Sequence, residues 1–143
     1  MCRQFKSVSK QKLFMKNYLW NMFANIQNGQ QAQRSFIIQN KKKICESFLN
    51  ILWNEGFISG YKTLNSTAVP KLKIFLKYVK NQPVIHSIKA ISKPSNRVHF
   101  SVKQIWKLNS ESSLLIFSTN KGLLTCTQCK KLNTGGELFA VIN

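Results

Sequence analysis

The sequence predicts an α+β fold divided between two small domains. Two early segments carry apolar residues at the three- and four-residue spacings of amphipathic helices, and several later segments alternate apolar and polar residues with the period of two that indicates strands. Lys93-Pro94 interrupts this alternation. The order of segments predicts an N-terminal domain with two helices on one face of an antiparallel sheet, followed by a C-terminal domain of mostly β-structure with one short helix.

The N-terminal part begins with a basic extension and a first helix. Residues 1–11 contain no acidic residue, and they are consistent with a transit peptide, an RNA-binding arm or an extension of the first helix. From 12 to 27, the spacing of apolar residues predicts an amphipathic helix that Asn28-Gly29 ends. The apolar positions are Leu13, Met15, Leu19, Met22, Phe23 and Ile26.

A second helix and a run of strands complete the N-terminal domain, which we expect to span residues 12–92. SFIIQ (35–39) is a short strand candidate. Residues 41–56 predict a helix that ends at Gly56, whose φ is unrestricted. Its apolar face consists of Ile44, Phe48, Ile51 and Leu52.

The last segments of this domain are predicted strands. LKIFLKYV (72–79) alternates apolar residues with residues that are mostly lysine, which indicates one buried and one charged face. Asn81-Gln82-Pro83 is a predicted turn, and VIHSIKAIS (84–92) alternates again. We therefore assign residues 84–92 to the N-terminal sheet.

The C-terminal domain is expected to span residues 93–143. Strands are predicted at 97–102, 113–118 and 137–142, with a short helix or irregular segment at 103–108. Thr125 precedes Gln128 by three residues, which is the capping-box pattern and predicts a helix from Thr125 to Lys131 or Leu132. Gly135-Gly136 is then expected to turn the chain into its last strand.

The charge balance indicates a polyanionic partner. There are 22 Lys and Arg against four acidic residues, a formal net charge of +18. Such an excess repels itself unless a polyanion neutralises it, so we expect a nucleic acid. No window approaches the roughly 20 apolar residues of a membrane span, and the cations are spread through every segment rather than gathered on one helix. The sequence therefore predicts no membrane partner.

Enzymatic and metal-binding functions find little support in the residue types. The chain has two His, four Glu and no Asp, and it lacks paired carboxylates, a phosphate loop and a nucleophile motif. A nucleophile built from Cys126 or Cys129 with His99 would lack a third orienting group. One Cys126-x-x-Cys129 pair supplies half the ligands of a zinc site, so small buried thiols are favoured. We predict no enzyme, no cofactor, no metal and no small-molecule substrate.

Short polar residues and glycines gather around the last two predicted strands. Hydroxyl and amide groups can contact base edges, ribose and phosphate, glycines permit close backbone approach, and Lys121 supplies charge for a phosphate. The same residue types also occur in ordinary turns. The residues concerned are Ser118, Thr119, Asn120, Lys121, Gly122, Thr125, Gly135, Gly136 and Glu137.

These segments resemble a known family. STNKGLLT followed by KLNTGGE resembles the C-terminal signature of the bacterial-type family of small-subunit ribosomal protein eight. NGQQAQ, ILWNEGFISGY and LKY…PVIHSIKAISKPSNRVH resemble further stretches of that family in the same order, over about residues 15–143. Asn120 stands where the family has Ser, Lys93 where it has Arg, and His99 where it has Tyr.

The resemblance implies a two-domain protein that binds small-subunit ribosomal RNA directly, in the central domain, and helps assembly early. Neighbouring small-subunit proteins are the other implied partners. The implied RNA-binding residues are the C-terminal set above together with Lys93, Pro94, Arg97 and His99. A free RNA-binding regulator outside the ribosome remains the alternative function.

Composition suggests a location. The 22 basic residues include only three Arg (Arg3, Arg34 and Arg97), and Asn is frequent. Lys, Asn, Ile and Phe are encoded by A/T-rich codons, which are common in organellar genomes. We therefore expect a mitochondrial ribosome, with a plastid ribosome as the alternative.

Overall fold

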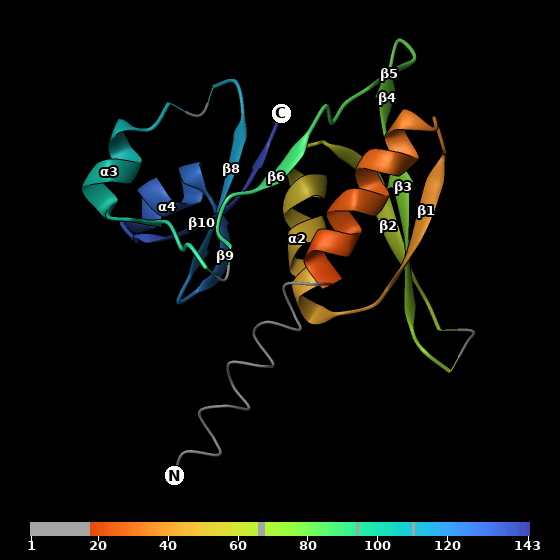
Figure 1. Cartoon of the computed structure of the whole chain (residues 1–143), viewed down its shortest axis with the longest axis horizontal. Coiled ribbons are helices and arrows are strands. Elements are labelled where there is room, and N and C mark those ends of the chain that lie inside the picture. The colour runs from red at the N-terminus through yellow and green to blue at the C-terminus, as the bar shows by residue number, and fades with distance from the viewer. Residues whose placement is uncertain (1–17, 66–67, 94, 110) are drawn as a thin grey trace. The chain divides into compact units, whose positions relative to one another are not determined.

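The computed structural model describes residues 18–65, 68–93, 95–109 and 111–143, and the chain divides into two compact units, Met1–Val84 and Ile85–Asn143 (Figure 1). The first unit contains helices and an antiparallel sheet, and the second is mostly strands with short helices, which confirms the α+β class. Within the described ranges, no helix is both long and apolar enough to cross a bilayer. The extension at 1–11, the helical positions Leu13 and Met15, and Pro94 lie outside the described residues.

The first helix packs on the sheet of unit 1, and its described part spans residues 18–31. Leu19, Met22 and Ile26 are fully buried, as the amphipathic pattern predicts. The predicted end at Asn28-Gly29 is wrong, because the helix continues to residue 31. A Cβ on Gly29 would lie 2.7 Å from Ile37 Cγ2 and 3.0 Å from a Leu76 methyl. The glycine therefore permits close packing of helix on sheet.

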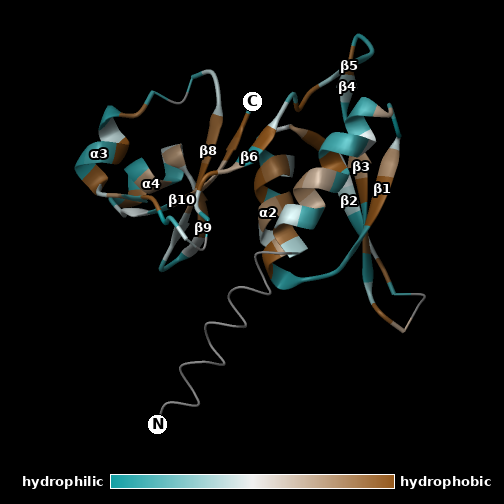
Figure 2. Cartoon of the chain, viewed as in Figure 1, coloured by the Kyte–Doolittle hydropathy of each residue, from teal (hydrophilic) through white to brown (hydrophobic). Residues whose placement is uncertain are grey.

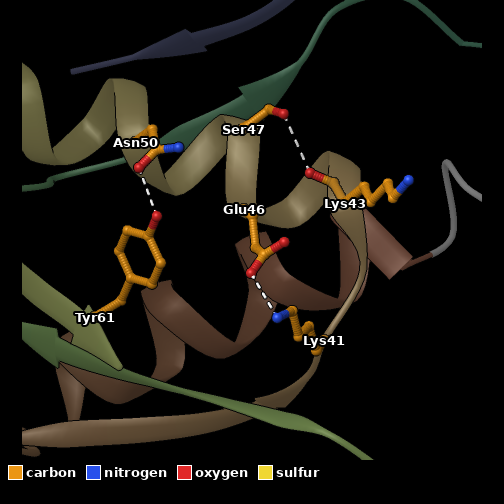
Figure 3. A network of polar contacts seen from close by, with 6 residues as sticks. All are labelled: Lys41, Lys43, Glu46, Ser47, Asn50 and Tyr61. Carbon is orange, nitrogen blue, oxygen red and sulfur yellow. Dashed lines mark hydrogen bonds and ion pairs between the residues drawn. The ribbon is translucent and has the colours of Figure 1, made fainter. Parts of the chain in front are cut away.

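Helix α2 (Lys43–Asn54) buries Phe48, Leu49 and Leu52, and the chain reverses at Gly56, which has a φ of +79°. Polar contacts attach α2 to its surroundings (Figure 3). The Tyr61 hydroxyl of β2 (Ile58–Leu64) donates to Asn50 Oδ1, and Lys41 Nζ lies 3.1 Å from Glu46 Oε1. The predicted helix and its terminating glycine are thus confirmed.

The sheet of unit 1 has the order β1-β3-β2, with antiparallel neighbours β1 (Phe36–Asn40) and β3 (Lys71–Leu76). Leu72, Ile74 and Leu76 are buried on the face that packs into the core, so the predicted period-two strand is confirmed in its first part.

The strand predicted at 72–79 is interrupted rather than continuous. Tyr78–Val79 forms the short strand β4, which pairs with β5 (Gln82–Pro83) in a separate hairpin. Its turn lies at Lys80 and Asn81, which have φ values of +50° and +61°. The predicted turn at 81–83 is therefore shifted, because Gln82 and Pro83 already belong to the returning strand.

Unit 2 is built on a sheet with the order β6-β10-β8-β9, in which β7 also pairs with β10. Helices α3 (Val102–Lys107) and α4 (Cys126–Leu132) cover one face of it, and hydrophobic residues run along most of β8 (Figure 2). The strands are β6 (Ile88–Ala90), β7 (His99–Phe100), β8 (Leu114–Thr119), β9 (Gly122–Thr125) and β10 (Gly136–Ile142). The core under the helices consists of Ile105, Leu115, Phe117, Cys126, Cys129 and Leu138.

The assignment of residues 84–92 to the N-terminal sheet is wrong. Strand β6 pairs with β10, opposing Ile88 to Ile142 and Ala90 to Ala140. Alternation shows that a segment is a strand but not which strand it pairs with. The compact units accordingly divide at Val84, whereas we expected the boundary after residue 92.

Two other parts of unit 2 differ from the predictions. The strand expected at 97–102 is reduced to β7, because Ser101 caps α3 in a capping box with Gln104. Strand β9, directly before α4, is not among the predicted strands. The capping box between Thr125 and Gln128 is confirmed.

Candidate nucleic-acid interface

The turn between β8 and β9 presents an amide and an ammonium group. Asn120 and Lys121 lie between the paired residues Thr119 and Gly122, and both are exposed. The Thr119 hydroxyl donates to the Gly122 carbonyl at 3.0 Å and accepts from the Lys121 N–H at 3.2 Å. Thr119 therefore holds the turn, and the side chains of Asn120 and Lys121 are exposed beyond it.

A row of polar side chains crosses three strands beside this turn. Glu137 on β10 is the register partner of Ser118 on β8 and of His99 on β7. Directly opposed residues of antiparallel strands share a face, with their Cβ atoms about 5 Å apart. The neighbouring pair Leu138 and Phe117 lies in the core beneath the helices, so the Ser118–Glu137–His99 row lies on the other face.

Gly135 and Gly136 permit close backbone packing and do not make the expected turn. A Cβ on Gly136 would lie 2.7 Å from the Ser118 carbonyl oxygen, and one on Gly135 would lie 2.8 Å from that of Phe100. The left-handed residue is Asn133, with a φ of +48°, which ends α4. The glycines thus allow the start of β10 to lie close to β8 and to Phe100 at the end of β7.

The segment before β7 is tied to the row by Glu137. The Ser92 hydroxyl donates to Glu137 Oε1, and Ser92 is fully buried. Next to it, Lys93 and Asn96 exchange two backbone hydrogen bonds of 3.0 and 3.1 Å. Lys93 and Arg97 are exposed beside this closed turn. Sequence reasoning did not identify the contact between Ser92 and Glu137, because the two residues are 45 positions apart.

Thr125 is buried, and its hydroxyl group caps helix α4. It is 2 % exposed, its hydroxyl accepts from the Gln128 N–H at 3.4 Å, and it lies 2.9 Å from the Thr127 hydroxyl. Its oxygen therefore satisfies the first turn of α4 rather than facing outward. Among the predicted site residues with described positions, the exposed side chains are those of Ser118, Asn120, Lys121, Lys93, Arg97 and His99.

Cys126 and Cys129 belong to the core of unit 2. They are 1 % and 0 % exposed, and burial raises the pKa of the Cys129 thiol. A raised pKa keeps the thiol protonated near neutral pH, which disfavours both nucleophilic attack and metal binding. The described residues contain no cluster of three or more His, Cys, Asp or Glu side chains that could bind a metal ion.

Replacement of Glu137 tests its contact with Ser92. Glu137→Ala leaves the buried Ser92 hydroxyl without this acceptor, so we expect the free energy of unfolding to fall by about 1–3 kcal/mol in urea titrations. Glu137→Gln keeps an acceptor oxygen and should cost less. Glu111→Ala, at an exposed position in the same unit, is the control and should stay within about 0.5 kcal/mol of wild type. Wild-type stability of Glu137→Ala would show that the contact is dispensable.

The sequence of this chain is similar to those of known proteins of one family. The family model described as Ribosomal protein S8 matches residues 17–143. The chain is similar to small ribosomal subunit protein uS8 of Novosphingobium aromaticivorans, with 33 % identity over 128 residues, which covers 90 % of this chain and 98 % of that protein. The corresponding protein of Wigglesworthia glossinidia brevipalpis is 35 % identical with the same coverage. That of Thermus thermophilus is 34 % identical over 130 residues, covering 85 % and 94 %.

Proposed function

This chain belongs to the ribosomal protein S8 family, and we propose from that premise that it is a structural protein of the small ribosomal subunit which binds the central domain of the subunit's RNA through unit 2. Its partners are small-subunit ribosomal RNA and neighbouring small-subunit proteins. The family is structural rather than enzymatic.

The observation that carries the proposal is the Ser118–Glu137–His99 row beside the Asn120-Lys121 turn. These side chains come from three strands and the turn between two of them, and they lie on the face that α3 and α4 leave uncovered. Unit 2 contains eight Lys and Arg against Glu111 and Glu137. A positively charged surface with short hydroxyl, amide and imidazole groups suits RNA, whose shallow minor groove exposes ribose hydroxyls.

Each group has a distinct role in this proposal. Lys121, Lys93 and Arg97 neutralise phosphates, which positions the RNA without selecting its sequence. Ser118 and Asn120 form hydrogen bonds to ribose or to base edges. Glu137 positions the Ser92 segment, and Gly136 keeps β10 against β8 so that the row has a defined spacing.

Two lysines of unit 2 give a matched test. Lys121 lies in the turn and Lys103 lies on α3; both are exposed. Replacing either lysine with Gln removes one positive charge, so the long-range attraction between the protein and RNA falls by the same amount in both variants. If Lys121 contacts a phosphate, Lys121→Gln should weaken binding to the subunit RNA about tenfold, whereas Lys103→Gln should have a much smaller effect. Filter binding at constant salt measures both. Equal losses would contradict the assignment of the turn to the interface.

The ribosome concerned is proposed to be that of an organelle, with mitochondria favoured over plastids. The support is the bias toward Lys over Arg and the frequent Asn, which match A/T-rich codons. Fractionation of the native cells, with the chain followed by immunoblotting, tests this location. Recovery with cytosolic ribosomes alone would contradict it.

A further inference from the structure

The sheet of unit 1 has an outer face that unit 2's proposed RNA interface does not use. On β1, Phe36 and Ile38 are 40 % and 49 % exposed, and Phe75 on β3 is 37 % exposed. Phe36 and Phe75 are register partners, so their two rings are neighbours on one face. Gly60 on β2 opposes Phe75, and nothing lies within 4 Å of the position that its Cβ would take. An open apolar surface with two aromatic rings results.

One lysine lies over both rings, and a second lysine lies opposite the first. Lys73 Nζ lies 3.8 Å from the Phe36 ring centroid and 5.4 Å from that of Phe75. Lys62 on β2 is the register partner of Lys73 on β3. Like charges directly opposite each other destabilise a sheet. None of the four glutamates in the chain lies on these three strands, so the strands themselves provide no anion that offsets this repulsion.

A pocket adjoins the same face along the edge strand β1. It has a volume of about 500 Å³, and Phe36 and Ile38 contribute to its lining. The other lining residues are Asn25, Asn28, Gly29, Arg34 and Ile37, and the amide nitrogen of Asn25 donates to Gln39 Oε1. Amides can form hydrogen bonds with base edges, and guanidinium groups bind phosphate. The pocket therefore extends the aromatic surface with groups of the same chemical preference.

We propose that the outer face of the β1-β3-β2 sheet is a second RNA-binding surface, which takes unpaired nucleotides. Bases stack on Phe36 and Phe75, a phosphate lies between Lys62 and Lys73, and the edge pocket accepts a further base or phosphate. Stacking on exposed sheet aromatics with flanking cations is a general way to bind single strands, because every base has a π-face. Lys73 interacts more strongly with a phosphate than with an aromatic ring. Because the lysine side chain is flexible, its ammonium group can move off the two rings, and bases can then stack on them.

The charge distribution favours RNA over a protein segment as occupant. A phosphate relieves the repulsion between Lys62 and Lys73, and the rings supply the complementary surface for bases. An apolar protein segment would cover the rings and leave the opposed lysines without an anion.

The test uses the full chain and two fluorescent probes of about 12 nucleotides, an oligouridylate and an abasic ribose-phosphate strand of equal length. Fluorescence anisotropy at constant salt measures both affinities. Wild type should prefer the probe with bases. Phe36→Leu with Phe75→Leu should reduce this preference by at least roughly 5- to 150-fold, which is the effect of losing one stacked base at about 1–3 kcal/mol. The control Trp53→Leu, at an exposed aromatic on α2, should keep it.

A second pair of variants tests the lysines. Lys62→Gln with Lys73→Gln should weaken both probes more than Lys43→Gln with Lys80→Gln, which removes two exposed charges elsewhere in unit 1. Melting of the RNA-free protein then checks that both pairs of variants are folded at the temperature of the binding assay.

Two results would overturn the proposal. One is an unchanged preference for bases in the Phe36→Leu, Phe75→Leu variant. The other is a Phe36→Leu, Phe75→Leu variant that binds both probes as well as wild type does but fails to join assembled small subunits. That result would assign the face to a protein neighbour. Failure of the Lys121→Gln test would leave these measurements unaffected, because Lys121 belongs to unit 2.

Discussion

Gly136→Ala is expected to destabilise the free protein by roughly 1–3 kcal/mol or more and to weaken RNA binding in the same variant. The added Cβ would lie 2.7 Å from the Ser118 carbonyl oxygen and 2.8 Å from Thr119 Cγ2. The first of these atoms belongs to the backbone of β8 and cannot rotate away. Strands β8 and β10 must therefore separate, which alters the spacing between Ser118 and Glu137. Urea unfolding and filter binding measure the two effects.

Gly60→Ala provides the matched control for stability. Gly60 also lies in a strand, but nothing lies within 4 Å of its Cβ position, and its φ is not positive. Alanine there should leave the free energy of unfolding unchanged or raise it by about 0.5–1 kcal/mol, because glycine in a strand has an entropic cost. If Gly136→Ala were as stable and bound RNA as well as wild type, the close approach of the two strands would be unnecessary for the interface.

RNA affinity is expected to fall steeply as salt concentration rises. Each neutralised phosphate releases bound counterions, and the plot of log association constant against log salt has a slope of about −0.9 per phosphate on duplex regions. For a chain of net charge +18, contact with about six to ten phosphates would lower affinity by about 10³–10⁵ between 50 and 200 mM salt. Filter binding across a salt series gives the slope.

The two lysine variants of unit 2 refine this measurement. If Lys121 contacts a phosphate, Lys121→Gln should reduce the magnitude of the slope by about one, and Lys103→Gln should leave it nearly unchanged. A nearly flat salt dependence for wild type would contradict the electrostatic basis of binding.

Local features of the chain follow from adjacent residues. The amphipathic helices, the reversal at Gly56 and the capping box of Thr125 with Gln128 all depend on contacts within a few positions. Spacing and side-chain type therefore predicted them. The family also follows from sequence alone, because its motifs occur in order along the chain.

Sequence patterns did not predict the structure where a glycine, or an alternation of apolar and polar residues, is compatible with more than one structure. Gly29 and Gly136 have the residue type of a turn, yet each allows another element to pack closely against it. Packing depends on the partner, so composition alone could not distinguish the two roles. The first helix was consequently predicted to end too early.

By itself the sequence determined the α+β class, the periodic helices and strands and the excess of positive charge, because these depend on residue types and short spacings. Only the tertiary structure decided that β6 joins β10, that Ser92 donates to Glu137, and that Ser118, Glu137 and His99 form one row. Alternation is the same whichever strand is the partner. The pairing is set by packing between segments far apart in the chain, where side-chain volume and buried hydrogen bonds select one register.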